Sequence, residues 1–164
     1  MAVVSLSGDH HLAAFDCGNA DLNTFLKRYA LQSQQGDFSC TFVTCRQDNH
    51  VIGFYTLSMG SVKHADATER MRKGASQHDI PVVLLARFAV CESARRQKIG
   101  GALLKDAMLN VMDVSRKVGV RAMLAHAKDE RARSFYEYFG FESGDTNDLH
   151  LFQVMKDIRR NLRR

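Results

Sequence analysis

The chain has 164 residues, of which 45% are hydrophobic and 25% are charged. This length and composition are typical of one domain whose core needs neither disulfides nor a metal ion. No apolar run approaches the roughly 20 residues of a membrane span, and the first residues lack the basic and apolar regions of a signal peptide. The sequence therefore predicts a single cytoplasmic domain over residues 1–164.

Cysteine and histidine usage argues against a metal site. The four cysteines lack CxxC spacing and are expected to be reduced, buried thiols: Cys17, Cys40, Cys45 and Cys91. The seven histidines are scattered, and the "DHH" near the N-terminus has no second pair of possible ligands. No metal cofactor is expected.

The charge is unevenly distributed. A net charge of +5 and a pI near 9.2 indicate an anionic partner. The C-terminal tail "KDIRRNLRR" has a single aspartate among its cations, which are Lys156, Arg159, Arg160, Arg163 and Arg164. Such a tail is either solvated or in contact with nucleic acid, and the sequence leaves both open.

The first elements are a helix and a β-hairpin. Asn19 is a candidate N-cap, and Leu22, Phe25, Leu26 and Tyr29 follow at helical spacing, so the pattern predicts an amphipathic helix that ends near residue 36. The segments "SCTFVTCR" and "HVIGFYTLSMGSV" are rich in β-branched and aromatic residues and flank "QDN". They predict two paired strands.

The second half of the chain alternates strands and helices. Residues 63–80 are polar, with a possible short helix at "ATERMRKG". The continuous apolar run at 82–91 predicts a strand buried on both faces. A helix at about 100–117, a strand at "VRAMLAHA", a helix at "DERARSFYEYFG" and a strand at "LHLFQVM" follow. This order predicts an α/β fold with a mixed sheet and a central βαβ crossover.

A basic, glycine-containing turn precedes the helix at 100–117. The segment "SARRQKIGG" lacks both GxxxxGK[ST] and GxGxxG, so it is neither a Walker A loop nor a dinucleotide fingerprint. Backbone amides from Gln97 to Gly101 could surround a pyrophosphate, with Arg95, Arg96 and Lys98 screening its charge. The alternative is that Gly100 and Gly101 only allow close helix–strand packing.

Two segments together resemble a known family. "LLARFAVCESARRQKIGGALL" and "AKDERARSFYEYFGF" are similar to the two signature segments of the GNAT superfamily of acetyl-coenzyme A-dependent N-acetyltransferases. In this alignment Arg95 takes the Gln/Arg position of the phosphate motif and Gly100 its last glycine, whereas Lys98 stands where the first glycine is usual. A lysine can present its backbone N–H there provided that the position needs no positive φ.

The resemblance extends over nearly the whole chain to a subgroup. "FDCGNADLNTFLKRYALQSQQGDFSCTFV", "VIGFYTLSMGSV", "IPVVLLARFAV" and "LHLFQVMKDI" resemble tRNA-acetylating toxins of the TacT type, from bacterial type II toxin–antitoxin pairs. The resemblance implies a homodimer and a ribbon-helix-helix antitoxin that covers the active site. It also implies that the pair represses its own operon by binding DNA through the antitoxin.

The resemblance also assigns the donor site. Acetyl-coenzyme A would be the acetyl donor, with the amides of Phe88, Ala89 and Val90 at the acetyl carbonyl and pantetheine arm. The residues assigned to the rest of the cofactor, chiefly its pyrophosphate, are Arg95, Arg96, Gln97, Lys98, Ile99, Gly100, Gly101 and Asp129. Tyr136 matches the family's general acid for the leaving thiolate. Periodicity alone does not separate Tyr136 from Tyr138, and a purely packing role for these aromatic residues is the alternative.

The acceptor is inferred from the strand before the loop. "VVLLARFAV" contains no carboxylate that could deprotonate a lysine, whereas an α-amine is already partly neutral at pH 7. Arg87 suits an anionic substrate such as the 3′ end of a charged tRNA, although it could instead pair with a buried acid. Further candidate tRNA contacts are Lys27, Arg28, Arg70, Arg72, Lys73 and the cationic tail.

The expected function is therefore acetylation of the α-amino group of aminoacyl-tRNA by a toxin, which blocks translation. One alternative is an N-acetyltransferase of a small amine or a protein N-terminus. Another is a non-catalytic protein that binds acetyl-coenzyme A or an antitoxin as a regulator.

Overall fold

The computed structural model describes residues 2–163 and contains one mixed sheet. Its strands are β1 (Val3–Ser5), β2 (Cys40–Cys45), β3 (Val51–Val62), β4 (Ile80–Val90), β5 (Ala122–His126), β6 (Glu142–Ser143) and β7 (His150–Val154), in the spatial order β1-β2-β3-β4-β5-β7-β6. Strands β4 and β5 run parallel, whereas the β1–β2, β2–β3, β5–β7 and β6–β7 pairs are antiparallel. The predicted mixed α/β sheet with its βαβ crossover is confirmed.

The helices follow the predicted order. They are α1 (Ala20–Thr24), α2 (Ala30–Gln35), α3 (Glu69–Arg72), α4 (Ile99–Ser115), α5 (Glu130–Tyr138) and α6 (Met155–Leu162). None of the helices in residues 2–163 combines the length and the hydropathy that a membrane span requires. The chain divides into two compact units, Met1–Ser58 with Ala86–Ala107, and Met59–Leu85 with Met108–Arg164. The single domain expected over residues 1–164 stays a prediction.

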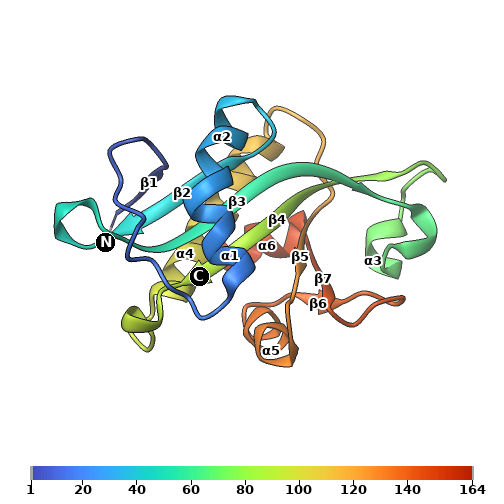
Figure 1. The fold of residues 1–164 in the computed structure, drawn as a ribbon. Helices are drawn as coiled ribbons and strands as arrows, with labels where there is room; N and C mark the ends of the chain where they lie inside the picture. The colour runs from blue at the N-terminus through green and yellow to red at the C-terminus, as the bar shows by residue number, and fades with distance from the viewer. Residues whose placement is uncertain (1, 164) are drawn as a thin grey trace. The chain divides into compact units, whose positions relative to one another are not determined.

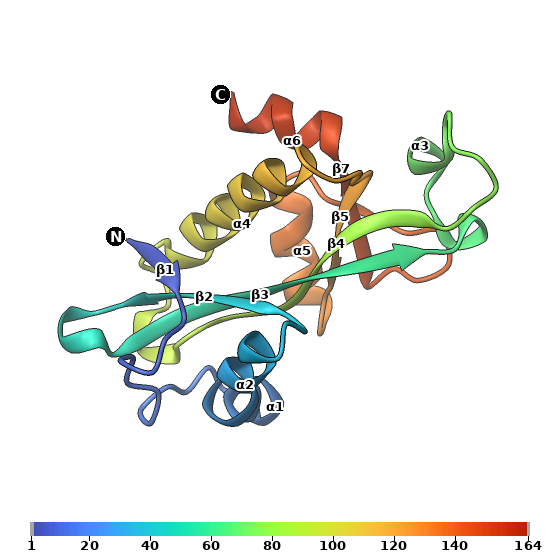
Figure 2. The same ribbon diagram turned by 90° about the horizontal axis from the view of Figure 1, so that it is seen from above.

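In the first unit, strand β3 has a helix on each face (Figures 1 and 2). Adjacent strand residues point to opposite faces. A Cβ at Gly53 would lie 2.8 Å from Cδ1 of Leu103, so the missing side chain lets α4 approach closely. The next residue, Phe54, faces the other way and stacks on Phe25 with ring centroids 6.4 Å apart.

The predicted N-terminal helix forms, but its middle is not α-helical. The Oδ1 of Asn19 accepts a hydrogen bond from the Leu22 N–H at 3.0 Å, which confirms the N-cap. Between α1 and α2 the chain forms a π-helical segment, Phe25–Tyr29. π-helical turns are rare and occur often at functional sites. The amphipathic pattern predicted the helix but could not predict this extra residue in the turn.

The core of the second unit is apolar. Val62, Val82, Leu124 and Phe152 pack together with Met71 of α3. Strand β5 is buried from Ala122 to Ala125, as its sequence predicted. Gly140, which follows α5, has a φ of +97°, the left-handed conformation in which glycine commonly ends a helix.

One ion-pair network holds α3 against the C-terminal helix of the second unit. The guanidinium of Arg70 donates to both oxygens of Asp157, at 2.6 and 2.9 Å, and to Glu142 at 2.8 Å. Asp157 is buried, and its hydrogen bonds to Arg70 hold the pKa of its carboxyl below the ordinary value. The "KDIRRNLRR" tail therefore begins as a packed helix, in which Ile158 is also buried.

Some sequence-based expectations need correction. The sequence does not predict β1 and β6, because both strands are very short. It does not predict α6 either, because the charged residues of this helix are typical of a polar tail. Only the first half of β4 is buried on both faces, since Arg87 is exposed and Phe88 is half-buried. The four cysteines are free, as expected, but Cys40 is exposed and Cys45 is half-buried.

Asp157→Asn tests the network. We expect a loss of about 2 kcal/mol of unfolding free energy at pH 7, because the bonds to Arg70 lose their charge. A carboxyl whose pKa is lowered on folding stabilises the fold above its unfolded pKa of about 3.9, and the contribution disappears as the pH falls below it. Urea unfolding of wild type and variant should therefore converge in acid. Asp113→Asn removes an exposed pair with Arg116 and serves as the control, with a change below about 0.5 kcal/mol.

Candidate active site: the phosphate loop and the buried tyrosine

The loop between β4 and α4 has an unusual backbone. After Cys91, a short 3₁₀ turn (Glu92–Ala94) leads to Arg95, which is extended. Arg96 and Lys98 then adopt left-handed conformations with φ of +67° and +60°. The condition under which a lysine would fit this position without strain, a negative φ, is therefore not met. A non-glycine residue in this region costs about 1 kcal/mol or more, which explains why the GNAT motif prefers glycine there.

This backbone is suited to an anion. A left-handed residue followed by a helical one turns successive N–H groups into the same concavity. The first turn of α4 adds N–H groups that have no partner within the helix, at the positive end of a 17-residue helix dipole. The side chains of Arg96, Gln97 and Lys98 are exposed around it. A pyrophosphate fits this arrangement in charge and in hydrogen-bond donors.

Arg95 is directed to a different partner. Its Nη2 donates to the carbonyl oxygen of Cys17 at 3.1 Å and lies 3.7 Å from Oε1 of Glu92. The N–H of Glu92 donates in turn to the Asp16 carbonyl at 2.8 Å. A Cβ at Gly18, which has a φ of +82°, would collide with the Glu92 carboxylate. The Arg95 side chain therefore fastens the loop to the segment at 16–18.

Arg46 is a second residue that holds the loop, and sequence reasoning did not identify it. Its Nη2 donates to the carbonyl oxygen of Ser93 at 3.1 Å, and the N–H of Cys91 donates to the Ile52 carbonyl at 2.8 Å. An isolated arginine after a strand carries no pattern that distinguishes it from a solvated one. Only the tertiary contact shows its function.

Arg87 lies at the edge of the π-helical segment in the first unit. Its guanidinium carbon is 4.8 Å from the centroid of the Phe25 ring, and its Nη1 donates to the Ala86 carbonyl. Among residues 2–163 no carboxylate lies within ion-pair distance of Arg87, so the alternative of a buried acid is wrong. Lys27 and Arg28 are exposed on the same π-helical segment. Two further exposed cations thus lie on the segment that Arg87 contacts through Phe25.

Tyr136 and Tyr138 differ sharply in the second unit. Tyr136 is 5% exposed and packs against Phe135 and Phe141, with ring centroids 5.4 Å away in both cases. Burial raises the pKa of its phenol well above the ordinary value. Tyr138 is 84% exposed. Periodicity could not separate the two residues, but burial does: only Tyr136 has a phenol held in a fixed, desolvated position.

Asp129 starts the helix that carries Tyr136. Its Oδ1 accepts the Ala132 N–H at 2.8 Å, so the residue predicted to contact the cofactor is also the N-cap of α5. This capping bond fixes the orientation of the carboxylate and of the helix's first turn.

The remaining basic candidates have unequal surroundings. Arg70 is held by Asp157 and Glu142, and Arg72 donates to the Ala67 carbonyl at 2.6 Å. Lys73 and the tail residues Lys156, Arg159, Arg160 and Arg163 are exposed, with Arg160 paired to Asp157. Arg164 lies outside the described residues. Contact of Arg70 with a phosphate would compete with its carboxylate partners.

Comparison with known proteins places this geometry in a family. A model described as an acetyltransferase (GNAT) domain matches residues 38–143. A tRNA-acetylating toxin of Mycobacterium tuberculosis is 41% identical over 155 residues, which cover 94% of this chain and 92% of that protein. The chain belongs to the GNAT acetyltransferase family. As a GNAT acetyltransferase it uses acetyl-coenzyme A as its acetyl donor.

Other proteins are similar to this chain over nearly its whole length. AtaT complexed with acetyl-methionyl-tRNAfMet has a TM-score of 0.90 and 28% identity, covering 97% of both chains. AtaTR bound with AcCoA has a TM-score of 0.84 and 29% identity over 97% of this chain and 96% of that one. A probable toxin TacT of Sinorhizobium fredii is 26% identical over 92% of this chain and 88% of its own length.

Lys98→Gly separates backbone conformation from charge in the phosphate loop. We expect it to bind acetyl-coenzyme A several-fold more weakly, because a cation is lost, while its unfolding free energy is unchanged or higher by up to about 1 kcal/mol. Lys98→Ala loses the same charge but keeps the strain, so it should match Lys98→Gly in affinity and be the less stable of the two. Calorimetry and urea unfolding measure both quantities. Wild-type affinity in both variants would exclude Lys98 from donor binding.

Proposed function

We propose that the protein is a toxin that transfers an acetyl group to the α-amino group of aminoacyl-tRNA and thereby blocks translation. The observation that carries the proposal is the 41% identity, over 94% of the chain, with a tRNA-acetylating toxin. The similar protein AtaT has been solved with acetyl-methionyl-tRNAfMet, a molecule that joins the acetyl group to an aminoacyl-tRNA. Its fold matches this chain with a TM-score of 0.90.

The donor is held mainly by backbone in this proposal. N–H groups from Gln97 to Gly101 bind the pyrophosphate, and the exposed side chains of Arg96 and Lys98 balance its charge. Arg95 acts by fixing the loop through Cys17. Amides near Phe88, Ala89 and Val90 polarise the acetyl carbonyl, and Asp129 contacts the donor from the start of α5. The bound thioester supplies an acetyl group already activated for transfer.

Tyr136 supplies the proton for the leaving sulfur. Because burial raises its pKa, the phenol remains protonated at neutral pH. As the amine nitrogen bonds to the acetyl carbon and the carbon–sulfur bond breaks, Oη of Tyr136 donates its proton to sulfur. The acceptor nitrogen releases one proton to solvent, from which Tyr136 is reprotonated. The α-amine, with a pKa near 8, needs no strong base for this step.

The acceptor is recognised by exposed cations. Arg87 keeps its guanidinium exposed on the Phe25 ring, and Lys27 and Arg28 follow on the π-helical segment. Guanidinium and ammonium groups suit RNA phosphates and repel a cationic lysine substrate. Lys73 and the exposed tail cations are further proposed phosphate contacts, and Arg70 and Arg72 are subordinate ones because they already bind protein groups.

The proposal includes partners. AtaT has been solved with the C-terminus of the antitoxin AtaR, and the AtaT–AtaR complex with DNA. We propose that this protein is likewise a homodimer with a ribbon-helix-helix antitoxin that masks its active site, and that the pair represses its own operon through the antitoxin. Because charged tRNA is its substrate, the protein acts in the cytoplasm.

Tyr136→Phe tests the catalytic assignment. Loss of the phenolic proton should lower the acetylation rate of charged tRNA about 100-fold or more, since general acids contribute about that factor. Acetyl-coenzyme A affinity should be nearly unchanged, and expression should no longer arrest growth. Tyr138→Phe changes the exposed tyrosine on the same helix and is the matched control, expected to remain active and toxic. Wild-type turnover in Tyr136→Phe would refute the assignment.

A further inference from the structure

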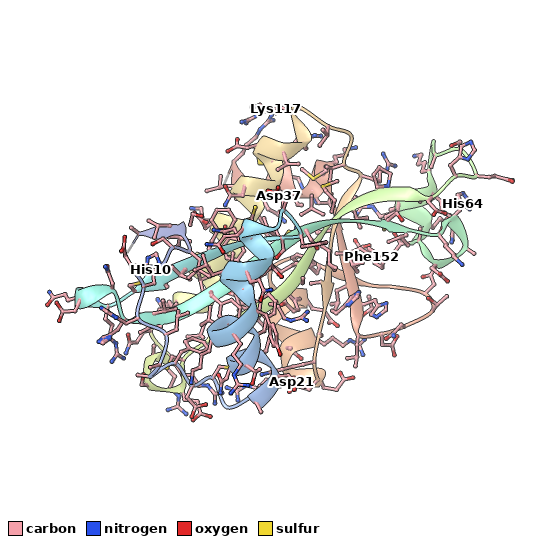
Figure 3. The ribbon with its side chains drawn as sticks, turned by 45° about the horizontal axis from the view of Figure 1, so that its top comes forward. His10, Asp21, Asp37, His64, Lys117 and Phe152 are labelled. Carbon is pink, nitrogen blue, oxygen red and sulfur yellow. The ribbon has the colours of Figure 1, made fainter. Side chains whose placement is uncertain are left out.

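A groove in the second unit has no part in the donor site described above. It has a volume of about 540 Å³, within the range typical of ligand sites. Its floor is apolar and comes from Val82, Leu84, Leu124 and Phe152, the last of which is labelled in Figure 3. Phe152 and Leu124 belong to the core of the unit, so the floor is backed by packed side chains.

Two glycines shape this groove. A Cβ at Gly60 would meet Val82 at 3.5 Å and Leu84 at 3.9 Å, which are ordinary contacts, so the glycine leaves space that a side chain could fill. At Gly144 a Cβ would lie 3.0 Å from the Phe152 ring and 3.2 Å from the His150 carbonyl oxygen. The absence of a side chain there lets the loop at 144–147 close over the groove.

One wall of the groove is a pair of stacked imidazoles. His126 and His150 stand directly opposite each other on β5 and β7, with ring centroids 4.1 Å apart and planes inclined by 16°. Gln153 of β7 donates to the Phe139 carbonyl at the end of α5. Since strand residues alternate, His150 and Phe152 lie on the face of β7 opposite to α5. The pair forms a flat aromatic surface beside an apolar floor.

The polar groups around the groove suit the edges of a base better than a run of phosphates. Lys63 is the cation of the lining and Asp66 its carboxylate, so the charge is mixed. Ser61, Thr146 and Asn147 add hydroxyl and amide groups at the rim. Unpaired RNA bases are recognised by stacking on aromatic rings, including histidine, together with hydrogen bonds to their edges. The ammonium group of Lys63 could pair with one neighbouring phosphate.

We propose that this groove binds an unpaired nucleotide of the tRNA acceptor end, with its base stacked beside the His126–His150 pair and its phosphate near Lys63. The inference rests on the proposed function, because aminoacyl-tRNA is what brings single-stranded nucleotides to the protein. It adds a substrate site on the second unit, separate from the phosphate loop and from Tyr136.

Two variants of the full-length protein test the groove. His150→Ala removes one ring of the stack, and Gly60→Val fills the groove at a strand position where an added Cβ meets only ordinary contacts. Each should raise KM for charged tRNA about ten-fold, the size expected for one stacked base. The dissociation constant for acetyl-coenzyme A and the melting temperature should stay close to wild type. His64→Ala, a histidine of the same unit outside the groove lining, is the control (Figure 3).

A second readout uses a trinucleotide copy of the tRNA 3′ end as a competitor. It should inhibit tRNA acetylation by wild type and by His64→Ala, and inhibit Gly60→Val at least several-fold less. If both groove variants keep the wild-type KM for tRNA, the groove inference is overturned. Acetylation of tRNA by these variants would still support the proposed function. An effect confined to antitoxin binding or to oligomer mass would also overturn it. If wild type acetylates no tRNA, both proposals fail together.

Discussion

The close packing of α4 on β3 is the constraint on which the donor site depends. Because Gly53 has no side chain, Leu103 and Ile99 reach the backbone of β3, and the first turn of α4 is fixed against the sheet of the first unit. On the opposite face, Phe54 anchors Phe25 and with it the π-helical segment that meets Arg87. Two adjacent residues of one strand thus position both the phosphate loop and a cationic surface proposed for the acceptor.

The cations in and beside the phosphate loop have two different roles. Arg95 and Arg46 point to backbone carbonyls of Cys17 and Ser93 and hold the loop from the protein side. Arg96 and Lys98 are the left-handed residues, and their side chains are exposed. The strain is retained because the tertiary contacts at both ends of the loop determine its path. The N–H groups of this turn point into one concavity, so the backbone is suited to bind an anion.

Local patterns predicted much of this fold. The N-cap at Asn19, the hairpin around residues 47–49 and the β4–α4–β5 crossover depend on short-range signals, and all three formed. The family motif singled out Tyr136, which composition and periodicity could not do. Sequence patterns did not predict properties that depend on distant residues. These are the positive φ of Lys98, the attachment of Arg95 to Cys17, and the pairing of Arg70 with Asp157 across 87 positions. The groove between β3 and β7 is of the same kind, because it joins four strands that no sequence pattern connects.

The most direct test of the proposed function is incubation with labelled acetyl-coenzyme A and total charged tRNA. The account predicts that label enters the tRNA fraction and is released by mild alkali, which cleaves the aminoacyl ester, as N-acetylated amino acid. Absence of label from tRNA, together with label on small amines or protein N-termini, would contradict it.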